Sequence, residues 1–300
     1  MFIDAHAHAF KNHPPIGGRK VFSNPEELIK RFDEAGIEKG ALLPIVSPEI
    51  YLPQSNEEIL EMVENHPDRF FAFCNVDPRA ITNSADAPLG DILRYYKNKG
   101  CKGLGEVMCN LPLQHPMVQN LFKHAEDVGL PLTFDMMGKM GGIFGLYDEV
   151  GLPQLEQSLQ RFSDLVIIGH STAFWAEIGR LRTPGDRSAV LFPDWNCKGG
   201  LPNYPIDEEG AVPWLFRRYP NLYGDLSADC GYNALARDRA YGIRFMNEFQ
   251  DRLLFGTDIC PPDMPFTTAD YLIELRNSGE ISQQVFNKIA RENAIKLFGL

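Results

Sequence analysis

The chain begins with a short run that could bind a metal ion, Phe2-Ile3-Asp4-Ala5-His6-Ala7-His8. Because side chains alternate across a β-strand, residues 4, 6 and 8 are expected on one face and residues 3, 5 and 7 on the other. Two imidazoles on one face can point at the same divalent cation. A His-x-His pair alone is a weak motif, since two polar loop residues can stand this close by chance. The rest of the chain must decide.

Four further apolar runs end in an acidic or imidazole side chain. They are Leu104-Gly105-Glu106, Leu132-Thr133-Phe134-Asp135, Ile167-Ile168-Gly169-His170 and Phe255-Gly256-Thr257-Asp258. Each one alone could be a satisfied buried polar group or a helix cap. Four of them together favour a shared site, because parallel barrels build their active sites at the carboxyl ends of the strands.

The elements that would position these groups repeat along the whole chain. Short apolar runs alternate with amphipathic stretches, which predicts strand–helix units around a parallel sheet. The expected strands begin near Phe2, Gly40, Phe70, Cys101, Leu130, Leu165, Leu222 and Leu253. We therefore expect an α/β fold, a TIM (β/α)8 barrel, as one domain over residues 1–300. A longer gap after the sixth strand indicates an insertion at about residues 183–210 that could overhang the active-site mouth.

Helix signals stand between the expected strands. Asn24 and Ser55 are predicted N-caps, each followed by acidic residues, and Gly129 is predicted to end the helix before the fifth strand. An open doubly wound sheet is the alternative architecture, and it usually carries Gly-x-Gly-x-x-Gly after its first strand. Here the first strand ends in histidines instead, which favours the barrel.

Together these motifs resemble the amidohydrolase superfamily of metal-dependent TIM-barrel hydrolases. Within it, the chain is most similar to the amidohydrolase-related branch that includes aminocarboxymuconate-semialdehyde decarboxylase. The resemblance spans nearly the whole sequence, from Ile3-Asp4-Ala5-His6-Ala7-His8 through Gly169-His170 and Phe255-Gly256-Thr257-Asp258 to a closing run at residues 289–299.

The resemblance implies roles for individual residues. His6 and His8 are implied metal ligands from the first strand, and His170 is the strand-six histidine, which joins the metal shell or stabilises a developing oxyanion. Asp258 is the strand-eight aspartate that binds metal or moves protons. Glu106 is similar to a strand-four glutamate that certain relatives use as a metal ligand.

One position departs from the branch, whose members usually have a histidine where this chain has Asp135. An aspartate can ligate through oxygen, but it adds negative charge and hardens the ligand set. We expect Asp135 to be a ligand, with a hydrogen-bond partner of His170 or a loop cap as the alternatives. The cofactor expected is one or two divalent metal ions, zinc first, with manganese, iron or cobalt as alternatives.

These groups would make the protein a metal-dependent hydrolase. A divalent metal would activate water, and Asp258 would accept the proton while an amide, lactone or ester bond of a small molecule is cleaved. A second reading is a metal-dependent decarboxylase or hydratase of a small unsaturated carboxylate, because some members of the resembled branch work in that way. A third is a non-catalytic small-molecule-binding barrel with a degenerate site, which Asp135 keeps open.

Other residues near the strand ends have several readings. His13 could face the pocket, and the aromatics Trp195 and Tyr204 of the insertion could close over a substrate. After His170, Trp175 and Glu177 could line the pocket or start a helix. Arg180 and Arg182 could pair with a substrate carboxylate or stay in solvent.

Composition excludes other classes of function. The formal net charge is −11, which argues against binding nucleic acid or another polyanion. No apolar run is long enough to predict a membrane span, and the first residues lack a secretory leader, so we expect a cytoplasmic protein. The six cysteines contain no Cys-x-x-Cys pair, which is typical of reduced thiols. The expected partner is a small-molecule substrate, and the proline-rich insertion could contribute to a homo-oligomer contact.

Overall fold

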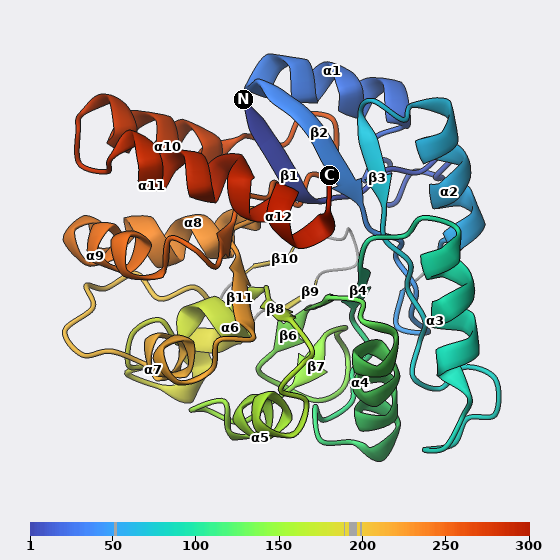
Figure 1. Ribbon diagram of the computed structural model, residues 1–300. Helices are drawn as coiled ribbons and strands as arrows, with labels where there is room; N and C mark the ends of the chain where they lie inside the picture. Colours follow the sequence, from blue (N-terminus) through green and yellow to red (C-terminus); the bar gives the residue numbers. More distant parts are fainter. Residues whose placement is uncertain (51–52, 189, 192–196, 199) are drawn as a thin grey trace.

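Eight parallel strands form a closed barrel in the computed structural model, which describes residues 1–50, 53–188, 190–191, 197–198 and 200–300 (Figure 1). The strands are β1 (Phe2–Ala7), β2 (Ile37–Leu42), β3 (Phe70–Ala72), β4 (Leu104–Val107), β5 (Leu132–Phe134), β8 (Ile167–Gly169), β11 (Leu222–Asp225) and β12 (Leu253–Leu254). They pair in the order β1-β2-β3 and β4-β5-β8-β11-β12. Parallel bridges Cys74–Leu104 and Ala7–Ile259 join the two sheets. The predicted TIM barrel is confirmed.

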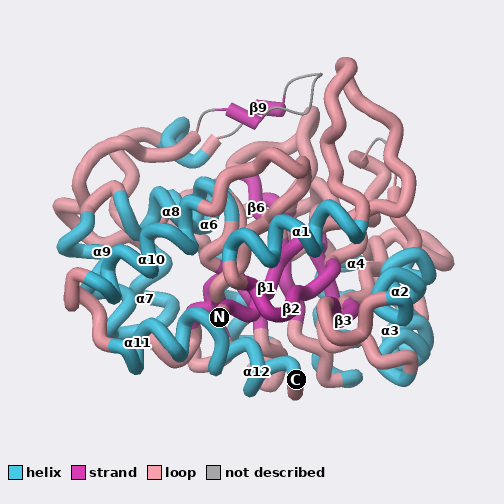
Figure 2. The backbone as a smooth tube through the Cα atoms, turned by 90° about the horizontal axis from the view of Figure 1, so that it is seen from above, coloured by secondary structure: helices cyan, strands magenta, loops and turns pink. Residues whose placement is uncertain are grey.

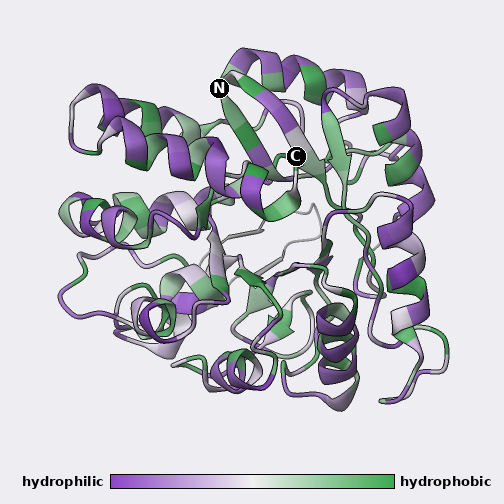
Figure 3. Cartoon of the chain, viewed as in Figure 1, coloured by the Kyte–Doolittle hydropathy of each residue, from purple (hydrophilic) through white to green (hydrophobic). Residues whose placement is uncertain are grey.

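Helices surround the barrel, and most of them connect consecutive strands. They are α1 (Pro25–Ala35), α2 (Asn56–Asn65), α3 (Leu89–Asn98), α4 (Pro116–Val128), α5 (Pro153–Arg161), α7 (Ala211–Arg218), α8 (Ala228–Ala236), α9 (Arg239–Phe249), α10 (Thr267–Asn277) and α11 (Gln283–Asn287). Figure 3 shows hydrophilic and hydrophobic bands alternating along these helices, as expected when one face packs on the strands.

The predicted helix ends are confirmed. The Asn24 side chain accepts a hydrogen bond from Glu27 N, and the Glu27 side chain accepts one from Asn24 N, which completes a capping box. Ser55 caps α2 by accepting from Glu58 N. Gly129 ends α4 in the left-handed conformation, with φ of 70°.

One end of the barrel is filled by apolar side chains. Inward residues of the strands form a cluster with Ala294 and Phe298 of the helix α12 (Asn293–Phe298), which follows a π-helical turn at Lys288–Glu292. Ile3 and Ala5 contribute from β1. Figure 1 views the barrel from this end, with α12 across its opening. Because this end is closed, a ligand can enter only from the opposite end of the barrel, where the strands finish.

The segment between β8 and β11 is irregular. It contains α6 (Thr172–Ala176), a 3-10 turn at Pro184–Arg187 and the antiparallel strands β9 (Val190–Leu191) and β10 (Cys197–Lys198) before α7 begins. In Figure 2, β9 lies at the end of the molecule opposite α12. Trp195 lies outside the described residues. That residues 183–210 are an insertion stays a prediction.

Candidate metal centre

The six residues singled out from the sequence come together at the open end of the barrel. His6 lies in β1 and His8 directly follows it, Glu106 belongs to β4, and Asp135, His170 and Asp258 follow β5, β8 and the short β12. Five of them are buried, and the side chain of Asp258 is 23% exposed. The register of β1 against β2 shifts between Asp4 and Ala7, so the strict alternation expected for this strand does not hold. The two imidazoles nevertheless point to a common centre.

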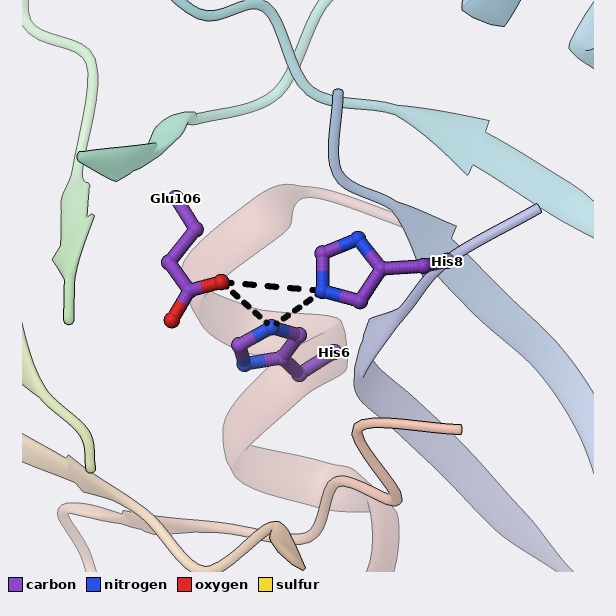
Figure 4. A group of neighbouring side chains, drawn as sticks. All are labelled: His6, His8 and Glu106. Carbon is purple, nitrogen blue, oxygen red and sulfur yellow. Dashed lines mark hydrogen bonds and ion pairs between the residues drawn. The ribbon is translucent and has the colours of Figure 1, made fainter. Parts of the chain in front are cut away.

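His6 and His8 face each other through ring nitrogen atoms (Figure 4). His6 Nε2 and His8 Nε2 are 3.0 Å apart. His8 Nδ1 lies 2.9 Å from the carbonyl oxygen of Leu43, which can only accept, so Nδ1 carries the proton of the ring. A neutral His8 therefore presents a lone pair at Nε2. The same argument holds for His6, whose Nδ1 lies 2.6 Å from a carboxylate oxygen of Asp225.

Two carboxylates complete this arrangement. Glu106 Oε2 lies 3.5 Å from His6 Nε2 and 3.6 Å from His8 Nε2. Asp258 Oδ1 lies 3.6 Å and 3.3 Å from the same two nitrogens. In a tetrahedral site with bonds near 2.1 Å, neighbouring ligand atoms are about 3.4 Å apart. Each carboxylate therefore lies at the distance from both imidazoles that ligands of one divalent metal ion would have.

Asp135 belongs to a second group that shares Glu106. One ligand atom from each of Glu106, Asp135 and His170 lies within 4.8 Å of the others. Asp135 Oδ1 is buried and receives no hydrogen bond from any described residue. An orphaned buried carboxylate oxygen beside another acid fits a cation better than it fits a loop cap. The two groups together suit one or two ions, and the ligand role of Asp135 stays a prediction.

The raised pKa values of His6 and His8 also indicate that the acidic groups of the centre favour a bound cation. Burial would lower the pKa of His6, but the charges of Glu106, Asp225 and Asp258 raise it well above the ordinary value. Burial would likewise lower the pKa of His8, but hydrogen bonds to Asp258 and Glu106 raise it to about 9. In the absence of a metal, the imidazoles thus take up protons to balance the acids, so a divalent cation fits the charge as well as the geometry.

Asp225 is the main site residue that the sequence analysis missed. Its Oδ2 lies 2.6 Å from His6 Nδ1 and 3.1 Å from His170 Nδ1, and it accepts a hydrogen bond from Ser227 Oγ. Its Oδ1 accepts from Ser227 N. One buried carboxylate therefore orients two imidazoles, whose Nε2 atoms are left to face the centre. Asp225 ends the strand Leu222–Asp225, so the strand-end rule applied to the other residues could have found it.

We expect Asp225→Asn to weaken metal binding by about ten- to a hundredfold, because an amide cannot accept equivalent hydrogen bonds from both rings. The affinity would be measured by competition with a chromophoric chelator. Asp229→Asn is the matched control, because Asp229 lines the cavity and its substitution removes one negative charge, as Asp225→Asn does. An Asp225→Asn protein with unchanged metal affinity would show that Asp225 does not set the orientation of the imidazoles.

The position of Asp258 is fixed by its backbone. Its φ is 53°, in the left-handed region that aspartate tolerates better than most residues. Asp258 N donates to the carbonyl oxygen of His6 at 2.7 Å. The preceding residue, Thr257, donates from both N and Oγ1 to the carboxylate of Asp4. These bonds tie the segment after β12 to β1 and place the Asp258 carboxylate beside the two histidines.

A cavity of about 410 Å³ opens above the centre. Its floor includes His8, Glu106, Asp135, His170 and Asp258. Its walls are mainly apolar and include Val21, Phe22, Ile45, Ile50, Met108, Met137, Phe144, Leu201 and Met264. Cavities of this size and lining suit a small organic molecule whose polar groups meet a few fixed polar side chains.

Several residues considered from the sequence lie elsewhere. Arg180 pairs with Glu208, and Arg182 pairs with Asp207 and packs on the Tyr204 ring. None of these five residues lines the cavity in the described part of the chain. They extend from the segment after α6 toward solvent, where each cation finds an acidic neighbour.

Trp175, Glu177 and His13 likewise contribute to packing. The buried Trp175 donates from Nε1 to the carbonyl oxygen of Asp225 at 2.7 Å, so it supports the site from behind. Glu177 forms a buried ion pair with Arg187 at 2.9 Å. His13 packs against Phe10 and Phe22.

The barrel and its centre define the class of the protein as a TIM barrel with a carboxylate- and histidine-rich divalent-metal site at the open end of its strands. Residues 3–300 match the family model described as Amidohydrolase, and the chain belongs to this family. None of the curated proteins matches the chain by sequence.

Solved structures share this fold over their whole length. A probable 2-pyrone-4,6-dicarboxylic acid hydrolase from Acinetobacter baumannii, with citric acid bound, is 16% identical with a TM-score of 0.61 (100% of this chain, 99% of that one). The 5-carboxyvanillate decarboxylase of Sphingomonas paucimobilis is 15% identical, with a TM-score of 0.62 over 100% of this chain and 99% of that one. A dihydroxybenzoic acid decarboxylase from Polaromonas, with bound manganese and 2-nitroresorcinol, is 15% identical, with a TM-score of 0.59 over 100% of this chain and 97% of that one. At these identities the likeness shows the fold.

Proposed function

We propose that this protein is a metal-dependent enzyme that decarboxylates a small unsaturated or aromatic carboxylic acid without oxidation. The observation that carries the proposal is the position of the metal-binding groups. The imidazoles and carboxylates lie on the floor of a cavity whose walls are mainly aliphatic, aromatic and methionine side chains. A carboxylate that enters such a cavity exchanges water for a few fixed polar groups.

Decarboxylation replaces a carbon–carbon bond with a carbon–hydrogen bond, so the site must supply a proton to the carbon that loses CO₂. A divalent ion bound at the centre would supply positive charge that holds the carboxylate and stabilises the developing negative charge. Asp258 relays the proton in this proposal: its partly exposed carboxylate takes a proton from water and gives it to the carbon that loses CO₂. It borders the cavity and lies beside the imidazoles of His8 and His170. His170 would join the metal shell through Nε2, since its Nδ1 is held by Asp225 and Ser227.

Hydrolysis of an amide, lactone or ester is the second candidate. It is favoured by the same acidic group, since Asp258 could take a proton from water instead of giving one to carbon. The similarity to a probable pyrone dicarboxylic acid hydrolase supports this candidate, as the similarity to two aromatic acid decarboxylases supports the first. We propose zinc or manganese as the metal. Imidazole nitrogens suit zinc, and the carboxylates Glu106, Asp135 and Asp258 suit manganese equally.

A substrate panel separates these reactions. The metal-loaded protein would be incubated with aromatic carboxylic acids on one side and with lactones, esters and amides on the other. We expect CO₂ release from a carboxylic acid, detected by a coupled carboxylase assay. Ring or bond opening without CO₂ would establish hydrolysis. Tight metal binding without turnover in either set would favour the non-catalytic binding barrel.

A further inference from the structure

The acidic side chains that line this cavity repel a carboxylate that approaches it. Glu106, Asp135 and Asp258 line its floor, Asp229 lies in its wall, and the whole chain carries a formal charge of −11. A divalent ion offsets two of these negative charges at the floor. The part of a substrate that lies away from the floor remains in a negative field. An anionic group there needs a cation of its own.

Arg19 is the one lysine or arginine among the described residues that line the cavity. It stands at the end of a two-residue hairpin in which Ile16 N donates to Arg19 O at 3.0 Å and Arg19 N donates to Ile16 O at 2.9 Å. Gly17 and Gly18 form the turn with φ of 57° and 77°. Two consecutive positive φ angles define the tight turn that matches the twist of paired strands, and glycine adopts them without steric cost.

The backbone on both sides of Arg19 is anchored while its charged end is not. Ile16 packs against the apolar cluster that includes Phe10, Phe22 and Ile45. The next residue, Lys20, is paired with Glu27. The guanidinium of Arg19 forms no hydrogen bond, ion pair or ring contact with any residue in the described part of the chain. This differs from Arg180 and Arg182, which both meet carboxylates.

We propose that Arg19 selects substrates with a second anionic group, such as a second carboxylate, and binds that group on the side of the cavity away from the metal centre. The inference rests on the proposed function, because it takes the reacting carboxylate to bind at the centre. A guanidinium offers two parallel N–H donors that match the two oxygens of a carboxylate. The preferred substrate is therefore a compact dicarboxylate with an apolar body that contacts the cavity walls.

Binding of two probes that differ by one carboxylate tests this assignment. Benzoate and isophthalate would be titrated calorimetrically into the metal-loaded protein. We expect isophthalate to bind about ten- to a hundredfold more tightly, as one charge-assisted contact allows. Arg19→Gln should bring the ratio of the two affinities close to one and leave benzoate binding unchanged. Arg19→Lys should retain part of the ratio, since lysine keeps the positive charge but lacks the two parallel N–H donors of the guanidinium.

Lys20→Gln is the matched control, because it removes the same charge from the adjacent exposed position and should keep the full ratio. The proposal is overturned if the ratio persists in Arg19→Gln, if both probes weaken equally, or if the parent shows no preference for isophthalate. Its failure is separable from that of the decarboxylase proposal. CO₂ release from monocarboxylates without an isophthalate preference rejects only the role of Arg19. A ratio that depends on Arg19 without any CO₂ release rejects only the reaction.

Discussion

A His6→Ala/His8→Ala protein is expected to lose its divalent metal completely, whereas the parent purified without chelator should carry about one or two ions per chain. The double substitution removes the two facing Nε2 atoms and leaves Glu106 and Asp258 as an uncompensated acidic pair. Metal content would be measured by inductively coupled plasma mass spectrometry. Activity should be lost together with the metal.

The control for this experiment replaces two histidines outside the site, at the end of α2 and within α4, as His66→Ala/His124→Ala, and should retain the metal. Circular dichroism would establish that each variant is folded. Treating the parent with a chelator should also lower its melting temperature, because a ligand that binds only the native state stabilises it by mass action. A parent that contains no metal and cannot be reloaded would exclude the metal-dependent reactions proposed here.

Asp258→Asn is expected to lower kcat by about a hundred- to ten-thousandfold while the protein keeps its metal. The amide cannot transfer the proton, but its oxygen and the side chains of His6, His8 and Glu106 remain to hold the ion. Turnover and metal content would be measured on the same preparation. Asp263→Asn is the control, since Asp263 is an exposed acid in the same loop. Full turnover in Asp258→Asn with metal retained would remove this residue from the proton-transfer role.

Much of the fold followed from the sequence because the apolar runs and the helix caps agreed with each other. The strand positions were less well predicted. Expected starts at Cys101, Leu130 and Leu165 lie before β4, β5 and β8, since these buried residues belong to the turns that lead into the strands. Apolar residues in the sequence indicate that a segment is buried. Whether that segment is a turn or a strand depends on backbone hydrogen bonding, which the apolar pattern does not show.

The candidate site was predictable where one rule applied, that chemistry in a barrel lies where strands finish. Asp225 obeys that rule, but its strand Leu222–Asp225 contains Tyr223 and Gly224 and lacks the continuous apolar run of the others. Arg19 could not be assigned from the sequence, because its place depends on a hairpin folding back over the cavity. Arg180 and Arg182 stand close to His170 along the chain, yet the segment after α6 carries them toward solvent.

The shared carboxylate oxygen of Asp225 makes His6 and His170 thermodynamically coupled, although they come from β1 and the end of β8. Each ring competes for the same acceptor, at 2.6 Å and 3.1 Å, so a change in the hydrogen bond of one ring alters the strength of the hydrogen bond to the other. The energetic effects of replacing the two histidines should therefore not add. Residues contributed by distant strands are thereby joined through one carboxylate, so a substitution at one histidine also changes the contribution of the other.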